Sequence, residues 1–276
     1  MPVLRLPQPY DFDVSTERFR AFGPDRANLW HEGGLHRVVD GRELRIEAAP
    51  GGVAVEPLAP ADEPVVRRLL GADFDLAGFA AFAYSEPVLR RLASKLAGFR
   101  PPLAPDPFEA IVGSITAQQV SLQAAFAIRS RLIERFGVRH QHAWSFPTRE
   151  RVAAAREEEL VSLGFSRRKA EYAIDVARSA LDFDELAELA DDEVKERLVA
   201  HRGLGEWSAD WFLARYLARP RAWPAGDLAL RKAVTAYYGN GRVLTTAEVR
   251  DLGARFEPFQ NLSAHYLLTG LRMVGT

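Results

Sequence analysis

The chain has 276 residues, of which 47% are hydrophobic and 26% charged, and its 36 basic and 37 acidic side chains give a formal net charge of −1. This composition is typical of a globular protein and excludes a disordered or collagen-like chain, and no apolar run reaches the ~18–20 residues that a membrane span needs. The absence of cysteine excludes disulfide bonds, thiolate nucleophiles and cysteine-ligated metal sites.

Residues 1–60 carry the signals of an antiparallel sheet. Two turn signals, Asp40-Gly41 and Gly51-Gly52, separate three runs of strand character. The runs are residues 35–39, 42–50 and 53–58. Two-residue turns of this composition connect neighbouring antiparallel strands. The pattern therefore predicts a three-strand meander, preceded by a short helix near residues 15–22.

From residue 62 onward, apolar residues recur at the spacing of amphipathic helices. The clearest start signal is at residues 106–109, where Asp, Pro, Phe and Glu stand in order. An N-cap, a first-turn proline and a glutamate at the third helical position predict a long helix from there to about Phe136. The other predicted helices span residues 62–70, 86–96, 148–163, 166–181, 191–201, 206–218, 227–238, 246–256 and 262–273.

The proline-rich stretch at residues 98–107 is the best internal boundary. We therefore expect an α+β fold in which a small antiparallel-sheet domain precedes an all-helical body. The expected segments are an N-terminal α+β domain over 1–86, a connecting helix and linker over 87–105 that packs on the C-terminal helices, a helical domain over 106–220, and C-terminal helices over 221–276 that complete a cleft.

A glycine-rich turn, Gly203-Leu204-Gly205, joins two of the predicted helices. Gly203 can adopt the left-handed conformation that ends the first helix, and Gly205 lets a ligand approach the backbone closely. The free N–H groups at the start of the second helix then form an anion site, which can hold a DNA phosphate without a basic surface. Taken alone, an ordinary glycine-capped junction is the commoner explanation of such a turn.

The turn resembles a helix-hairpin-helix motif, with Arg202 in place of the usual proline. Three stretches resemble the AlkA-type 3-methyladenine glycosylases of the helix-hairpin-helix DNA glycosylase superfamily. They are DPFEAIVGSITAQQVS (106–121), GLGEWSADW (203–211) and WPAGDLALRKAV (223–234). A fourth, FEPFQNLSAHYLL (256–268), is looser, because Gln260, Asn261 and Leu268 replace the family's Arg, Ser and Trp. The resemblance covers residues 106–276, and the N-terminal meander also fits the family.

The resemblance implies a monofunctional glycosylase of base excision repair, which flips out an alkylated purine and hydrolyses its N-glycosidic bond to leave an abasic site. Asp227 matches the family's catalytic aspartate, which stabilises the oxocarbenium-like sugar and orients or deprotonates water. Asp227 is also an ideal N-cap for the next helix, and the two roles can coexist. Trp207 stands where bifunctional members carry the Schiff-base lysine, so no lyase activity is implied.

The same resemblance makes Trp207 and Trp211 candidates for the base pocket. They are four residues apart on one helix face, and a cationic alkylated purine over an indole gains ~0.5–2 kcal/mol. Phe256, where the family carries Trp, is a further candidate wall. All three aromatic residues are also ordinary core candidates.

Two glutamines in the long predicted helix complete the candidate set. The resemblance places Gln118 near the flipped base and makes Gln119 the side chain inserted into the duplex. Two solvated glutamines are the alternative, above all for Gln119. The candidate DNA-binding residues around the hairpin are Arg202, Gly203, Leu204, Gly205, Glu206 and Ser208.

The expected partner is double-stranded DNA containing alkylated bases, in a cytoplasmic, nucleoid-associated setting, with no membrane and no deducible protein partner. No organic cofactor and no metal ligated by side chains are expected, although a monovalent cation at hairpin carbonyls is compatible with the resemblance. Two alternatives stay open. One is another specificity on the same scaffold, such as hypoxanthine, and the other is a non-catalytic helix-hairpin-helix DNA-binding protein.

Overall fold

A five-stranded antiparallel sheet forms the N-terminal part of the computed structural model, which describes residues 2–276. Its strands, in the spatial order β1-β5-β4-β3-β2, are β1 Val3–Arg5, β2 Asn28–His31, β3 Gly34–Val39, β4 Arg42–Ala49 and β5 Gly52–Glu56. Asp40 and Gly41 both have positive φ, at 45° and 72°, as the predicted two-residue turn requires. The predicted meander is confirmed as β3-β4-β5, and β1 and β2 extend it on either side.

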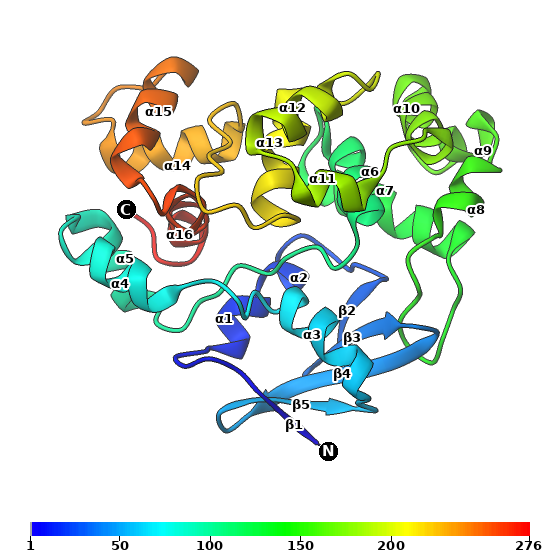
Figure 1. Cartoon of the computed structure of the whole chain (residues 1–276), viewed down its shortest axis with the longest axis horizontal. Coiled ribbons are helices and arrows are strands. Elements are labelled where there is room, and N and C mark those ends of the chain that lie inside the picture. Colours follow the sequence, from blue (N-terminus) through cyan, green and yellow to red (C-terminus); the bar gives the residue numbers. More distant parts are fainter. Residues whose placement is uncertain (1) are drawn as a thin grey trace.

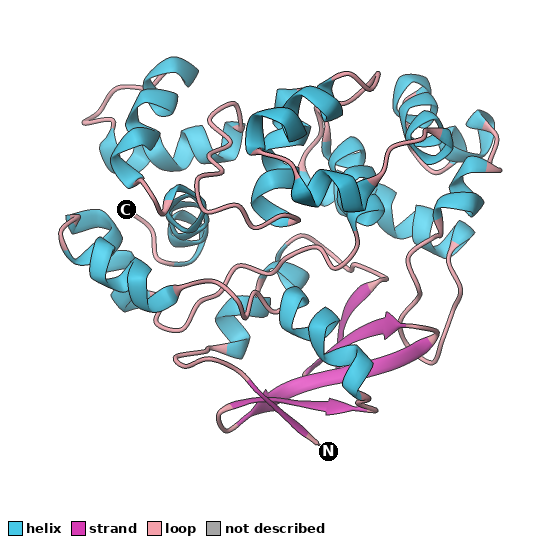
Figure 2. Ribbon diagram, viewed as in Figure 1, coloured by secondary structure: helices cyan, strands magenta, loops and turns pink. Residues whose placement is uncertain are grey.

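Helices make up the rest of the fold (Figure 2). They are α1 Phe12–Thr16, α2 Arg18–Ala21, α3 Glu63–Leu69, α4 Leu76–Tyr84, α5 Pro87–Lys95, α6 Pro107–Ala117, α7 Leu122–Phe136, α8 Arg149–Ala153, α9 Glu157–Ser162, α10 Arg167–Arg178, α11 Phe183–Glu188, α12 Asp191–Val199, α13 Glu206–Arg215, α14 Leu228–Tyr238, α15 Thr246–Gly253 and α16 Gln260–Met273. Within residues 2–276, no helix combines the length and the apolar character of a membrane span.

The long helix predicted from residue 106 is wrong in one respect. Asp106 caps α6 as expected, but the chain leaves the helix at Gln118 and re-enters at α7, which Ser121 caps through its side chain. Between them Gln119 has a φ of 55°, which no α-helix accommodates. The break replaces helix with a short loop at residues 118–121, in which Gln118 is half-buried and the other three residues are exposed.

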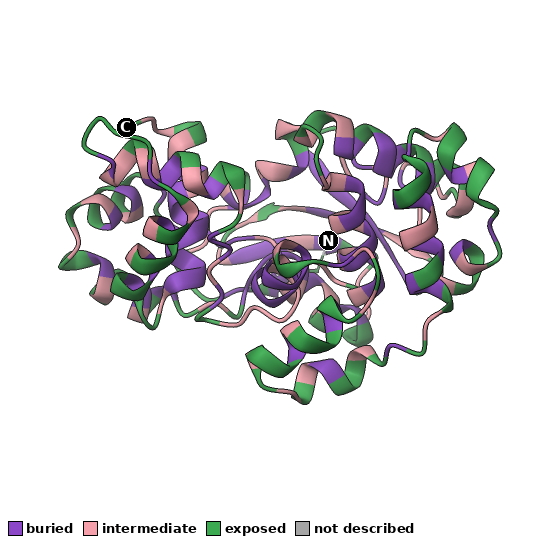
Figure 3. Ribbon diagram, turned by 90° about the horizontal axis from the view of Figure 1, so that it is seen from above, coloured by how far each residue is buried: buried purple, intermediate pink, exposed green. Residues whose placement is uncertain are grey.

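The structure has three hydrophobic cores rather than the two implied by a sheet domain and a helical body. The sheet packs with α3, and α6 to α13 surround a second core. The third core joins α4 and α5 to α14, α15 and α16, and Figure 1 shows α5 beside α16. In the ribbon of Figure 3, buried segments gather toward the interior of the molecule and exposed segments lie mostly on its outside. Buried residues of α4 and α5 thus share a core with the C-terminal helices, whereas the domain boundaries at residues 86, 105 and 220 stay predictions.

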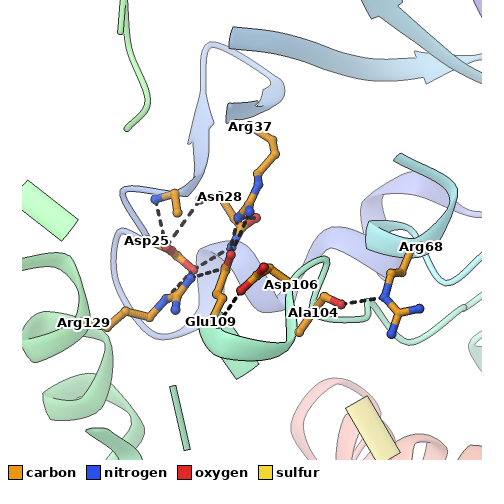
Figure 4. Close-up of polar contacts among 9 residues, drawn as sticks. Asp25, Asn28, Arg37, Arg68, Ala104, Asp106, Glu109 and Arg129 are labelled. Carbon is orange, nitrogen blue, oxygen red and sulfur yellow. Dashed lines mark hydrogen bonds and ion pairs between the residues drawn. The ribbon is translucent and has the colours of Figure 1, made fainter. Parts of the chain in front are cut away.

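The sheet is tied to the helical body by a buried ion-pair network (Figure 4). Glu109 on α6 accepts from both Arg37 on β3, at 2.7 Å, and Arg129 on α7, at 2.5 Å. Arg129 also pairs with Asp25 at 3.1 Å. Burial alone would raise the pKa of the Glu109 carboxyl, but the two guanidinium groups outweigh burial and lower the pKa to about 2.

Candidate active site

The side chain of Asp227 lies at the start of α14 and faces the helix after the hairpin. Its Oδ2 accepts from the indole Nε1 of Trp207 at 2.8 Å and of Trp211 at 3.1 Å. Its Oδ1 accepts from the backbone N–H of Leu230 at 2.8 Å. The predicted N-cap is thereby confirmed, and the same carboxylate is fixed by two indole groups four residues apart on α13.

The hairpin turn depends on Gly203 for a physical reason. Its φ is 90°, and a Cβ there would lie within 2.1–2.5 Å of the ring atoms of Tyr172. Gly205 is different, because its φ is −107° and an added Cβ would meet no atom within 4 Å. Gly203 is therefore required by the fold, whereas the space in front of Gly205 is open to solvent and to a ligand.

The first turn of α13 has backbone N–H groups that are free to bind a ligand. Gly205 is its N-cap and supplies no side-chain acceptor. In the described part of the chain, neither a side chain nor a backbone carbonyl accepts from the N–H groups of Glu206, Trp207 and Ser208. With the helix dipole behind them, these groups make an anion site whose approach passes the open side of Gly205.

Of the other predicted hairpin residues, two are buried and two have exposed side chains that form ion pairs. Leu204 and Ser208 are buried, at 4% and 1% exposure, so only their main-chain atoms can face a ligand. Arg202 is exposed but pairs with Glu171 at 2.7 Å, and Glu206 pairs with Arg250 at 3.0 Å. Arg202 would have to leave that pair to reach a phosphate.

The two predicted glutamines occupy the loop between α6 and α7. The amide Nε2 of Gln118 donates to the carbonyl of Gly203 at 2.8 Å, and Ser208 Oγ lies 3.5 Å away. Gln118 thus links this loop to the hairpin. Gln119 is exposed at the tip, and the neighbouring Val120, which the sequence reading overlooked, is 40% exposed. An exposed apolar residue beside Gln119 was the available signal for an insertion loop.

The prediction that Phe256 walls the pocket is wrong. Phe256 has no exposed surface and packs against Trp223 and Tyr238, with ring centroids 5.3 Å and 5.8 Å away. Its position in the third core follows from the short 3₁₀ turn that ends α15, which points the ring inward. Phe256 therefore supports α14, the helix that Asp227 caps, from behind.

The sequence reading also missed Arg215 and His265, which lie beside Trp211. The guanidinium of Arg215 is 4.3 Å from the centroid of the Trp211 ring, and the ring of His265 is 5.9 Å away. One face of Trp211 is thus already covered by a cation, so that face cannot receive a cationic base while Arg215 stays in place. The spacing of Trp207, Trp211 and Arg215, four residues apart, was the signal that could have found Arg215.

The first two turns of α13 carry a backbone anion site and two indole groups. The indoles orient the carboxylate of Asp227, which lies at the start of α14. Asp227 can accept a proton from water or stabilise a nearby positive charge. No amine stands at position 207, so a Schiff base cannot form there. Two surface hollows, of about 270 Å³ on α8 and α9 and about 410 Å³ on α3, include none of these residues.

Comparisons with known proteins identify the family to which the chain is similar. A sequence model of the HhH-GPD superfamily base excision DNA repair proteins matches residues 112–258. A DNA-3-methyladenine glycosylase of Bacillus subtilis is 29% identical over 203 residues, covering 71% of this chain and 67% of the relative. The chain spans just over half the length of two further curated relatives.

Solved structures extend the likeness to the whole fold. The 3-methyladenine DNA-glycosylase of Archaeoglobus fulgidus has a TM-score of 0.89 and 26% identity, covering 99% of each chain. The 8-oxoguanine glycosylase/lyase of Clostridium acetobutylicum, solved with double-stranded DNA, has a TM-score of 0.81 over 95% of this chain and 92% of that one. At 17% identity, this second likeness concerns the fold alone.

Proposed function

This chain belongs to the HhH-GPD superfamily of base excision DNA repair proteins, and from that premise we propose that it is a monofunctional DNA glycosylase acting on alkylated purines. The observation that carries the proposal is the Asp227 carboxylate, held by two indole N–H groups on the helix that the hairpin opens. The names of the Bacillus subtilis and Archaeoglobus fulgidus proteins support the substrate class.

In the proposed reaction, the free amides at the start of α13 bind a phosphate of double-stranded DNA. The loop at residues 118–121 enters the duplex through Gln119 and Val120, and the target nucleotide turns out toward Asp227. Water then attacks C1′ of the deoxyribose while the N-glycosidic bond breaks, and the bonding electrons leave with the base. Asp227 stabilises the cationic sugar and accepts the proton of the water, which leaves free base and abasic DNA.

The proposed reaction uses no organic cofactor. A monovalent cation at the hairpin would need carbonyl ligands, but the carbonyl of His201 already accepts from the N–H of Leu204 at 3.0 Å. The carbonyl of Gly203 accepts from Gln118 at 2.8 Å. Each of these oxygens keeps only one free lone pair for a cation, and no step of the proposed reaction is assigned to one. A protein with this reaction acts wherever the DNA is, and we propose a nucleoid-associated setting.

Release of labelled base from treated duplex DNA tests the proposal. We expect free 3-methyladenine and 7-methylguanine to be released, measured by chromatography of the soluble fraction. Because position 207 offers no amine, borohydride should trap no covalent complex with the DNA. A known bifunctional glycosylase is the positive control for trapping. Binding without release of either base would favour a non-catalytic DNA-binding protein, and trapping would contradict the monofunctional reaction.

Two glycine substitutions distinguish an effect on phosphate binding from an effect on the stability of the fold. We expect Gly205→Ala to change the free energy of unfolding by less than about 1 kcal/mol, because the added methyl group meets open space. Binding to an abasic-site duplex should weaken by about tenfold, since the methyl group lies in the phosphate's path. Fluorescence anisotropy measures the affinity, and urea unfolding measures the stability.

Gly203→Ala is the matched control. Its positive φ and the contact with Tyr172 predict a loss of roughly 1–3 kcal/mol of stability. If Gly205→Ala leaves DNA affinity unchanged, the anion site at α13 is not where the phosphate binds.

A further inference from the structure

The phosphate site at the start of α13 carries a negatively charged side chain of its own. Glu206 is the first residue of this helix, and its side chain is 64% exposed. Side chains on an α-helix lean toward its N-terminus, so the Glu206 carboxylate lies at the end where the free N–H groups emerge. The helix dipole attracts a carboxylate at this end just as it attracts a phosphate. An unrestrained Glu206 would therefore compete with the DNA.

A residue of another helix draws the Glu206 side chain away from these N–H groups. Arg250 on α15 lies 44 residues further along the chain, and its Nη2 donates to Oε1 of Glu206 at 3.0 Å. In the described part of the chain, the Glu206 carboxylate accepts no other hydrogen bond. The bond to Arg250 is therefore what sets the position of this carboxylate in the DNA-free protein.

Arg250 is committed to Glu206 rather than shared with a second acid. Among residues 2–276, Glu206 is its one ion-pair partner. The next carboxylate on this face of α13 is that of Asp210, which pairs with Lys195 at 2.8 Å. Glu206 and Asp210 are four residues apart, a spacing at which like charges repel each other. Each acid of this face thus has its own cation, and Arg250 is the one beside the phosphate site.

The ion pair of Arg250 and Glu206 matters more for DNA binding than for stability. The two side chains are 55% and 64% exposed, and pairs as exposed as this add little to the free energy of unfolding. A phosphate at the N–H groups, however, brings a further negative charge beside Glu206. With Arg250 in place, the charge of the carboxylate is compensated and its position is fixed. Without Arg250, the carboxylate is free to turn over the N–H groups that the phosphate needs.

We propose that Arg250 is a positioning residue for DNA binding, which holds the Glu206 carboxylate aside and so keeps the anion site of α13 open. Glu206 is then a competitor built into the chain, and it acts against the phosphate only when Arg250 is lost. Arg250 works through Glu206 and need not touch the DNA. This inference rests on the proposed function, because it concerns the phosphate site at which that reaction begins.

A double-mutant cycle on the affinity for an abasic-site duplex tests this role. We expect Arg250→Met to weaken binding by about tenfold at low ionic strength, because an uncompensated carboxylate then faces the phosphate. Glu206→Gln keeps the size of the side chain and removes its charge. In the Glu206→Gln background, Arg250→Met should therefore change the affinity by no more than about twofold. Fluorescence anisotropy measures the affinity, and urea unfolding verifies that each variant is folded.

Two outcomes of the cycle overturn the proposal. One is an affinity of Arg250→Met within about threefold of wild type. The other is a loss of more than about twofold that persists in the Glu206→Gln background, because Arg250 would then act on the DNA or on the fold rather than through Glu206. Arg197→Met is the matched control, since it removes the same charge from an exposed pair with Glu185 and should leave the affinity within about twofold of wild type.

The salt dependence of binding distinguishes positioning from direct contact a second time. Each phosphate that a cation neutralises adds about −0.9 to the slope of the logarithm of the association constant against the logarithm of the salt concentration. We expect the double variant to keep the wild-type slope, and a slope shallower by about one would show that Arg250 binds a phosphate and overturn the proposal. Failure of the wild-type protein to release 3-methyladenine would instead overturn the proposed function, and the cycle, which measures binding alone, would be unaffected.

Discussion

Asp227→Asn should lower the rate of base release by on the order of 10³-fold while DNA binding persists. The substitution keeps the size of the side chain and the oxygen that caps α14. It removes the negative charge that would stabilise the sugar cation, and it leaves no group that can accept a proton from water. It also turns an amide N–H₂ toward the indole N–H groups of Trp207 and Trp211, which now donate to Oδ2.

The measurement is single-turnover release of base from 3-methyladenine DNA, with affinity for an abasic-site duplex measured beside it. Asp251→Asn, the same chemical change at an exposed position on α15, is the control and should behave as wild type. Full activity in Asp227→Asn would remove this residue from the mechanism. Loss of binding and activity together would instead assign Asp227 a structural role.

Glu109→Gln should destabilise the protein by roughly 3–5 kcal/mol, because it leaves Arg37 and Arg129 buried with their shared carboxylate removed. Arg129 keeps the carboxylate of Asp25, whereas Arg37 is left with amide oxygens only, that of Asn28 and that of the substituted side chain. Urea unfolding at neutral pH measures the loss. Glu185→Gln, which breaks an exposed pair with Arg197, should change stability by no more than about 0.5 kcal/mol.

The stability difference between the wild type and Glu109→Gln also has a predicted pH dependence. The pKa of Glu109 is about 2 in the folded protein, below its ordinary value of 4.5. A group with a depressed pKa contributes its full stabilisation above pH 4.5. This contribution to the free energy of unfolding is lost as the pH falls from 4.5 through 2. The stability difference between wild type and Glu109→Gln should therefore shrink over this interval. A difference that stays constant from pH 5 to pH 2 would show that the carboxylate charge does not hold the network together.

Local signals in the sequence were sufficient to predict most of the helices. Caps such as Asp106 and Asp227, which bond their own backbone three residues on, act within a few residues and leave a readable pattern. The break at residues 118–121 was missed because no glycine or proline marks it. Gln119 adopts a positive φ, and Gln118 bonds to Gly203, 85 residues away. A contact of that range overrides local helix propensity.

The sequence likewise indicated some residues of the candidate site and not others. Resemblance and spacing indicated Asp227, Trp207 and Trp211, and the structure brings these three together. The four-residue spacing placed Arg215 on the same helix face as Trp211, but only the structure shows that its guanidinium lies over the indole ring. The prediction for Phe256 was wrong because the sequence shows an aromatic residue at a family position but not the direction in which its ring points.

The third core has a consequence for how the chain is made. Leu89, Leu92 and Leu96 of the α5 region leave the ribosome long before α16, the helix that covers them, has been translated. At ~5–20 residues per second, the nascent chain waits on the order of ten seconds with this apolar surface uncovered. The bundle therefore closes only after α16 has been translated, and its early half is the stretch that a chaperone would meet.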